Sequence, residues 1–215
     1  MSSVVEWTEG VQYETGTIVV HQGAIYRATQ PHTSQQGMHP AAAVQFWVVE
    51  NVTALAEAPV TWVGTTGNAI PANAIQGGEE ADGQPLYIAR GWIEGGLHVG
   101  KVSRNWWDGA RISYGGKEIT VRDYEILIGS LSAIRWVPAR GPLRVENFQE
   151  TFIEGGREAS GEPLFVARAK IVPRGESRPG VHPGKAGPGL TCHVAYGGEE
   201  RMFEQYEVLV LNRAQ

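Results

Sequence analysis

The sequence of 215 residues contains a single cysteine, Cys192. One cysteine cannot form an intrachain disulfide, so the fold must be held together by packing, and such low cysteine usage fits a reducing compartment. No stretch approaches the roughly 18 consecutive apolar residues of a membrane-spanning helix, and the first residues lack the basic and apolar regions of a secretion signal. We therefore expect a cytoplasmic protein without membrane insertion, with release by an unconventional route as a further option.

An excess of positive charge is missing as well. The 18 Lys and Arg residues face 23 Asp and Glu residues, which gives a formal net charge of -5. A chain of this charge has no long-range attraction for phosphate backbones or anionic lipids. We therefore do not expect nucleic acid as a partner.

Helical periodicity is also scarce, and turn residues take its place. The 28 Gly and 12 Pro residues punctuate the chain at intervals typical of short strands. Segments such as 86–90 (LYIAR), 118–122 (EITVR) and 206–211 (YEVLVL) are rich in β-branched and aromatic residues or alternate in polarity. The pattern predicts an all-β fold.

Signals of enzymatic chemistry are weak. Residues 95–101 (GGLHVGK) have the spacing of a phosphate-binding loop, but Val102 stands where such a loop needs Ser or Thr. The adjacent acids Glu79 and Glu80 would point to opposite faces of a strand, unlike the paired carboxylates of a glycosidase. The six histidines show no metal-type spacing. We expect no catalytic residue, no metal and no cofactor.

An internal repeat organises most of the chain. Residues 77–90 (GGEEADGQPLYIAR) align without a gap with residues 155–168 (GGREASGEPLFVAR), and shorter motifs around HxGK, YGGxE and YExL recur downstream. The offset between the copies drifts from 78 to 84 and then to 82, because residues 173–179 add a loop rich in Gly and Pro to the second copy. Two β-rich copies at 54–130 and 131–215 follow from this alignment.

The repeated pattern resembles the DM9 repeat, which occurs in tandem in lectin-like proteins. The resemblance implies a pseudo-twofold tandem-repeat β-sandwich with one mannose-type sugar pocket per repeat and no enzymatic activity. It also implies that an early acid and the Lys of the Gly-Lys step hold the sugar. Those positions are Glu80 with Lys101, and Glu158 with Lys185; both acids are Glu where the family pattern has Asp. We add Asp82 as a candidate beside Glu80.

The first fifty residues lie outside the repeat. Their pattern of aromatics and glycines resembles the small chitin-binding modules of the family 5/12 type, which implies a small N-terminal β module at 1–50 that binds chitin-like glycans. Such modules present a row of aromatic side chains, and the candidates here are Trp7, Tyr13 and Trp47, although Trp47 is equally compatible with a core strand. Residues 51–59 would form the linker.

Sugar recognition also needs an aromatic face against the apolar side of the ring. Trp106 and Trp107 follow the Gly-Lys step of the first copy, and because neighbouring strand residues point to opposite faces, one of them should be exposed. The second copy has no Trp after Trp136, so the two pockets should differ. The alternative to a sugar-binding role for the Glu and Lys pairs is a simple salt bridge at the surface. A non-catalytic protein interaction scaffold is the alternative function, and a homodimer is a further expectation for either.

Overall fold

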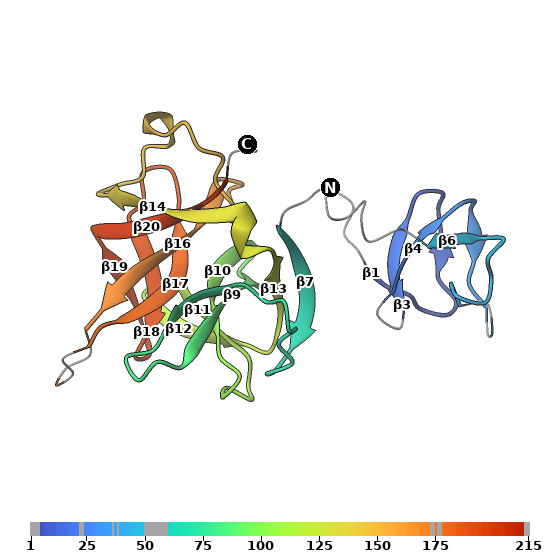
Figure 1. The fold of residues 1–215 in the computed structure, drawn as a ribbon, viewed down its shortest axis with the longest axis horizontal. Coiled ribbons are helices and arrows are strands. Elements are labelled where there is room, and N and C mark those ends of the chain that lie inside the picture. Colours follow the sequence, from blue (N-terminus) through green and yellow to red (C-terminus); the bar gives the residue numbers. More distant parts are fainter. Residues whose placement is uncertain are drawn as a thin grey trace. The chain divides into compact units, whose positions relative to one another are not determined.

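The computed structural model describes residues 5–21, 24–35, 37, 39–49, 60–172, 175 and 178–212. The chain divides into two compact units, Met1–Ala58 and Pro59–Gln215, which we call the N-terminal unit and the repeat unit (Figure 1). The predicted linker at 51–59 lies outside the described residues. No helix in the described part of the chain is long and apolar enough to cross a membrane.

The N-terminal unit contains two small sheets. Strands β1, β3, β4 and β6 form a four-stranded sheet in the order β1-β3-β4-β6, and β2 pairs with β5. The strands are β1 (Val5–Glu6), β2 (Gln12–Tyr13), β3 (Ile18–His21), β4 (Ala24–Ala28), β5 (His32–Thr33) and β6 (Trp47–Val49). A compact core fills the space between them and consists of Tyr13, Val19, Tyr26, Ala28, Ala43 and Trp47.

The repeat unit is built from strands and two short 3-10 helices, with no α-helix among its described residues. The first repeat supplies β7 (Val60–Thr66), β8 (Gln76–Glu79), β9 (Pro85–Ile93), β10 (Gly96–Val102), β11 (Ala110–Tyr114), β12 (Lys117–Val121) and β13 (Asp123–Gly129). The second supplies β14 (Ile134–Arg140), β15 (Glu154–Arg157), β16 (Pro163–Ile171), β17 (Gly180–Ala186), β18 (Cys192–Tyr196), β19 (Glu199–Phe203) and β20 (Gln205–Leu211). The helices are η1 (Leu131–Ala133) and η2 (Val145–Asn147). The all-β tandem repeat is therefore confirmed.

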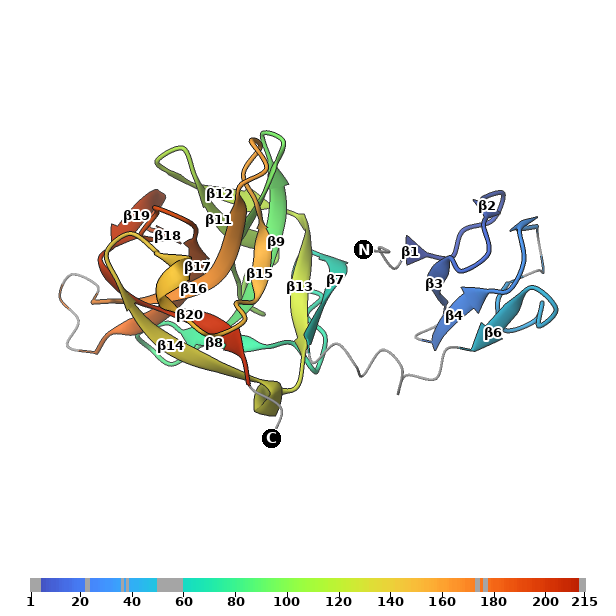
Figure 2. The ribbon, with the colours of Figure 1, turned by 90° about the horizontal axis from the view of Figure 1, so that it is seen from above.

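The strand order of the large sheet is symmetric with respect to the two repeats. The fourteen strands run β14-β20-β16-β15-β10-β11-β12-β19-β18-β17-β8-β9-β13-β7, and β9–β10 and β16–β17 add further pairings. Each strand lies as far from one end as its counterpart lies from the other, and β12 meets β19 at the centre, where Lys117 pairs with Glu199. Figures 1 and 2 show β7 with β13 on one side of this unit and β14 with β20 on the other. A pseudo-twofold axis therefore passes between β12 and β19.

The two repeats exchange strand pairings. Strand β10 of the first repeat pairs with β15 of the second, and β17 of the second pairs with β8 of the first. The hydrophobic core is exchanged as well, because one cluster draws equally on both copies. Its members are Ile75, Ile88, Val99 and Leu127 from the first repeat and Ile134, Ile153, Val166 and Leu209 from the second. Each repeat thus completes the sheet and the core of the other.

Two glycines of the repeated motifs are required by close backbone approach. An added Cβ at Gly78 would collide with the carbonyl oxygen of Val181 on β17, the strand exchanged from the other repeat. An added Cβ at Gly100 would collide with the carbonyl oxygen of Arg111 on the neighbouring β11. At these positions of the Gly-Gly and Gly-Lys motifs, the neighbouring strand therefore lies too close to leave room for a side chain.

The position of the predicted insertion agrees with the strands. Between β9 and β10 lie only Glu94 and Gly95, both with positive φ, which form a two-residue hairpin turn. The equivalent connection between β16 and β17 runs from Val172 to Pro179. The extra residues therefore lengthen one hairpin, and each strand of the second repeat still corresponds to one strand of the first.

Candidate functional site

A cluster that we call site A surrounds Lys101, and both repeats contribute to it. Lys101 lies near the end of β10 and is only 2% exposed. Its Nζ lies 2.7 Å from Nδ1 of His182, which comes from β17 of the other repeat. The opposite ring nitrogen, Nε2, lies 3.8 Å from a carboxylate oxygen of Glu80, which follows β8. Glu80 and Lys101, predicted as a pair, are therefore neighbours of one bridging histidine.

The charges of site A follow from this burial. Burial lowers the pKa of Lys101 to about 8, although the carboxylates of Glu80 and Glu118 oppose the shift. Burial and the Lys101 charge lower the pKa of His182 to about 3, so the imidazole is neutral at pH 7. An ammonium group only donates hydrogen bonds, so Nδ1 of His182 accepts and Nε2 carries the proton that faces Glu80. Burial also raises the pKa of Glu80.

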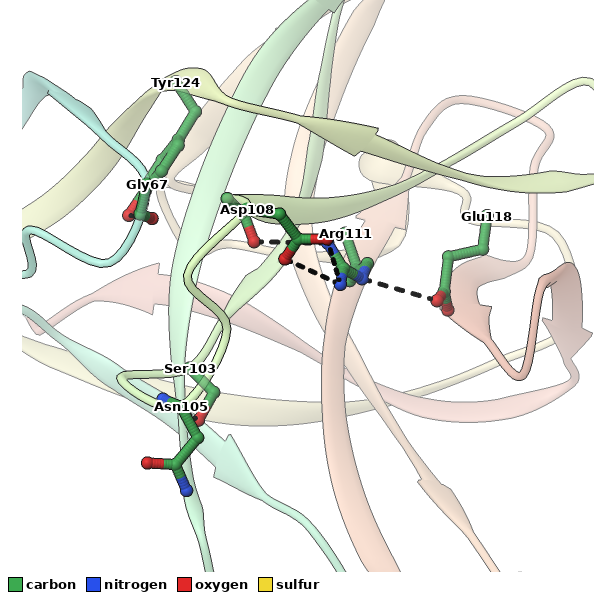
Figure 3. Close-up of polar contacts among 8 residues, drawn as sticks. Gly67, Ser103, Asn105, Asp108, Arg111, Glu118 and Tyr124 are labelled. Carbon is green, nitrogen blue, oxygen red and sulfur yellow. Dashed lines mark hydrogen bonds and ion pairs between the residues drawn. The ribbon is translucent and has the colours of Figure 1, made fainter.

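Aromatic and guanidinium groups form one wall of site A. The Lys101 ammonium lies 5.8 Å from the centre of the Trp106 ring and 5.3 Å from that of Tyr196. The guanidinium group of Arg111 lies 5.2 Å from the centre of the Trp106 ring. Figure 3 shows Arg111 between Asp108, at 2.9 Å, and Glu118, at 3.8 Å. Trp106 thus lies near two cations.

Site B is the pseudo-symmetric counterpart around Lys185, which is 3% exposed. Its Nζ lies 3.1 Å from Nδ1 of His98 on β10 and 3.6 Å from Glu200. The Nε2 atom of His98 lies 3.9 Å from Glu158. The Lys185 ammonium also lies 5.5 Å from the centre of the Tyr114 ring. Each lysine therefore contacts a histidine of the opposite repeat and an aromatic ring from it.

The electrostatics of site B parallel those of site A. Burial lowers the pKa of Lys185, and burial with the Lys185 charge lowers the pKa of His98 to about 4. Burial alone would raise the pKa of Glu200, but hydrogen bonds from His193 and from the Gly116 amide, together with the Lys185 charge, hold it at about 2. Glu200 is therefore a firmly ionised partner of Lys185. In site A, no carboxylate of the described residues lies within ion-pair distance of Lys101.

Strands β10 and β17 each serve both sites because of an odd residue spacing. His98 and Lys101 are three positions apart on β10, so their side chains leave the strand on opposite faces. Lys101 belongs to site A and His98 to site B. His182 and Lys185 repeat this arrangement on β17. The two sites are consequently cross-connected through two strands whose residues are almost all buried on both faces.

The remaining sequence candidates fall in different places. Trp107 is 73% exposed and Trp106 is half-buried, so one of the two is exposed, as predicted. Both lie in the loop between β10 and β11 and not in a strand. Asp82 is exposed in the turn after β8, where its carboxylate accepts hydrogen bonds from the backbone and side chain of Gln84. It reaches site A only through the electrostatic effect of its charge on Glu80.

The row of aromatics predicted on the N-terminal unit is corrected by the structure. Tyr13 and Trp47 are each only 3% exposed and pack edge to face with ring centres 5.1 Å apart, so they belong to the core. Trp7 is half-buried against that core, with its ring edge on to His21. A small unit without disulfides needs its largest apolar side chains inside, which is the reason why two of the three are unavailable to a ligand.

Four members of the sites were not among the candidates selected from the sequence, namely His98, His182, Glu118 and Glu200. The signal was present, because all four recur at equivalent places of the two copies. What the repeat could not reveal is that the histidine of one copy serves the lysine of the other. Among the residues that the structure describes, no group of three or more His, Cys, Asp or Glu side chains is arranged to hold a metal ion.

Comparisons with known proteins bear on both units. The family model described as DM9 repeat matches residues 18–107 and 105–174, together well over half of the chain. Its boundaries differ from those of the structural copies, β7–β13 and β14–β20. None of the curated proteins matches the chain. The comparisons give no support to a chitin-binding module at residues 1–50.

Six solved chains are similar to this one, among them the crystal structure of the nematode sperm cell motility protein MFP2B. The sequence identity is 14% and the TM-score 0.50, over 89% of this chain and 61% of that chain. At this identity the likeness shows the fold alone. This chain spans about three-fifths of the length of that protein.

Proposed function

The chain belongs to the DM9 repeat family, and from this premise we propose that it is a lectin that binds mannose-type glycans through sites A and B. The family is of a lectin-like, carbohydrate-binding type. The observation that carries the proposal is the recurrence of one constellation at two pseudo-symmetric places, a half-buried glutamate and a buried lysine joined by a histidine of the opposite repeat.

The chemistry of the constellation suits sugar hydroxyls, which both donate and accept hydrogen bonds. The Lys101 ammonium has three donors and uses one of them on His182, and the Glu80 carboxylate has no hydrogen-bonding side chain within the described residues. An acceptor and a donor of opposite charge therefore lie beside the same histidine. Hydrogen bonds to charged groups are stronger than neutral ones, which compensates for the small size of a sugar ligand.

We propose different ligand lengths for the two sites. Site A has Trp106 in its wall and the exposed Trp107 beside it, which supply aromatic faces for the apolar side of further sugar rings. Site B has no tryptophan at this place, and its lysine is partly neutralised by Glu200. Site A therefore suits an oligosaccharide and site B a terminal sugar, and joint engagement of both sites would raise the overall affinity by avidity.

The test is calorimetric titration of the full chain with a mannose oligosaccharide, for wild type and for Glu80→Gln and Glu158→Gln. Each variant keeps the side-chain shape and removes one charge, so we expect each to abolish one of two binding events. The control is Glu146→Gln, which removes an exposed carboxylate remote from both sites. The proposal fails if wild type shows no binding, or if the double variant binds as wild type does.

A protein interaction scaffold is the second candidate, and the exposure of Trp92 (56%) and Trp107 (73%) favours it. Large exposed aromatics are common at protein interfaces. In that case Trp92→Ala and Trp107→Ala would abolish partner binding, and no mannose oligosaccharide would bind to the wild type.

For the N-terminal unit we propose binding to chitin-like glycans through Trp7, since Tyr13 and Trp47 are in the core. The expected result is retention of the protein on chitin beads, loss of retention in Trp7→Ala, and unchanged binding of mannose oligosaccharides. Failure of the wild type to bind the beads would end this part of the proposal and leave the repeat unit untouched.

A further inference from the structure

Two grooves on the repeat unit occupy pseudo-symmetric positions away from sites A and B. One, the repeat-1 groove, has a volume of about 240 Å³ and is lined by Arg90, Trp92, Asp123 and Glu125 among others. The other, the repeat-2 groove, has a volume of about 1100 Å³, and its lining includes the equivalent residues Arg168, Lys170, Gln205 and Glu207. The same place in the fold thus holds a small groove in one repeat and a large one in the other.

Both grooves share the same base. In the repeat-1 groove Arg90 pairs with Glu125 at 2.6 Å and stacks on Trp62 at 4.3 Å. In the repeat-2 groove Arg168 pairs with Glu207 at 2.7 Å and stacks on Trp136 at 4.1 Å. These ion pairs are internally neutral, so the difference between the grooves must come from the residues next to them.

The neighbouring row of side chains differs in charge. In the second repeat this row crosses three adjacent strands as Arg140 on β14, Gln205 on β20 and Lys170 on β16. Arg140 is the direct partner of Gln205, and the register of β16 with β20, continued by two residues, brings Lys170 to the other side of Gln205. The corresponding row of the first repeat reads Thr66, Asp123 and Trp92.

The repeat-2 groove carries positive charge that no ion pair compensates. Of its lining residues, Arg168 is paired with Glu207, and Glu79 is paired with Arg178. Arg140 and Lys170 are exposed and have no ion-pair partner within the described part of the chain. In the repeat-1 groove the residue left over after the Arg90 and Glu125 pair is Asp123, a negative charge. The unpaired charges of the two grooves are therefore opposite in sign.

The long hairpin between β16 and β17 explains why Lys170 has no carboxylate partner. Arg157, near the repeat-1 groove, stacks on the Trp92 ring at 5.1 Å. The equivalent pair in the second repeat is Glu79 and Lys170, with opposite charges that would attract each other. Glu79 instead pairs with Arg178, which the longer hairpin supplies. Lys170 is thereby left available to a ligand.

We propose that the repeat-2 groove is a third binding site and that it takes an acidic oligosaccharide, with its carboxylate or sulfate group between Arg140 and Lys170. Neighbouring strands are roughly 4.8 Å apart, so the two cations stand on strands about 10 Å apart and can hold one anion from both sides. The amide of Gln205 lies between them as a further donor. The volume exceeds the roughly 300–1000 Å³ of typical small-ligand pockets, which leaves room for several sugar rings.

A glycan suits this groove better than an acidic peptide. Peptide sites are organised around buried apolar or aromatic anchors. The walls here combine charged and amide side chains, including Gln76 on β8, with apolar ones such as Leu131 and Phe203. Such walls match the hydroxyl groups of a sugar. The site is independent of the proposed lectin function, because none of its lining residues belongs to site A or site B.

The experiment is calorimetric titration of the full chain at low ionic strength with a heparin-derived hexasaccharide, which carries sulfates, and with a hexagalacturonate, which carries carboxylates. The test variant is Arg140→Gln/Lys170→Gln. The matched control is Arg122→Gln/Arg144→Gln, which makes the same change in net charge at exposed positions outside the groove. A mannose hexasaccharide serves as the neutral ligand, and a hexaglutamate peptide as the acidic non-sugar.

We expect the test variant to bind at least one acidic hexasaccharide about tenfold or more weakly than wild type, and the control to bind it as wild type does. Sulfate and carboxylate ligands report separately which anion is preferred. The proposal is overturned if neither acidic sugar binds, if both double variants weaken binding equally, or if hexaglutamate binds at the same residues as tightly. Mannose binding should be unchanged in the test variant and lost in Lys101→Met/Lys185→Met, so failure of either proposal can be recognised separately.

Discussion

The buried ammonium of Lys101 should make the stability of the repeat unit rise with pH. Burial lowers its pKa from an ordinary 10.5 to about 8, so between these values the folded protein has released a proton that the unfolded chain still holds. Raising the pH through this window therefore favours the folded state. At about 1.4 kcal/mol per pKa unit, the shift corresponds to roughly 3 kcal/mol that burial of the charge removes from stability at pH 7.

The perturbation that isolates this contribution is Lys101→Met, which keeps the length of the side chain and removes the charge. Urea unfolding of both proteins at pH 7.5, 8.5 and 9.5 gives the difference in unfolding free energy. Other groups that titrate in this range, such as Cys192 and the buried tyrosines, occur in both proteins and cancel in the difference. We expect wild type to gain about 1.4 kcal/mol per pH unit relative to the variant above pH 8.

The control is Lys117→Met, which removes an ammonium that already lies in water and should give a difference that does not change with pH. A difference between wild type and Lys101→Met that is equally constant would refute the argument, because the ammonium would then not be desolvated by folding. Function should move in the opposite direction. Site A loses its charged donor above pH 8, so sugar affinity should fall while stability rises.

Three further predictions concern single residues of the repeat unit. His182→Leu, although in the second repeat, should weaken sugar binding at site A by removing the acceptor for Lys101, and calorimetry should show site B intact. Gly100→Ala should destabilise the protein by about 1–3 kcal/mol because its Cβ meets backbone, whereas Gly64→Ala, with open space around it, should change the unfolding midpoint little. Trp107→Ala should reduce affinity for a mannose oligosaccharide, leave affinity for methyl mannoside unchanged, and change stability by less than about 0.5 kcal/mol.

Much of the fold was accessible from the sequence because a repeat constrains two copies at once. The drift in offset predicted a longer hairpin in the second copy, and the structure has it between β16 and β17. Periodicity also predicts the faces of a strand, and the odd spacing of His98 and Lys101 fits their placement in two different sites. It cannot predict which strand lies opposite each face, and for that reason the exchange of β10 and β17 between the copies was not foreseen.

The candidate site shows the same boundary between local and long-range information. Glu80 and Lys101, predicted as a sugar-binding pair, lie close enough for the charge of each to shift the pKa of the other, while their role in binding stays a prediction. The alternative of a surface salt bridge does not fit a lysine that is 2% exposed. Tyr13 and Trp47 were misassigned because aromatic residues at regular intervals are equally typical of a binding face and of the core of a small unit, and only the packing distinguishes these two cases.

The exchange also explains where the two repeats agree and where they differ. A lysine in one repeat needs the histidine of the other. A change at His182 would leave the buried ammonium of Lys101 without its acceptor, and a buried polar group without a partner is destabilising. At the grooves the contacts between the repeats already differ, since Arg157 stacks on Trp92 whereas its counterpart Glu79 pairs with Arg178. Lys170 stands there in place of Trp92 and Gln205 in place of Asp123. The paired sites are therefore constrained to resemble each other, whereas the grooves are free to acquire opposite charge.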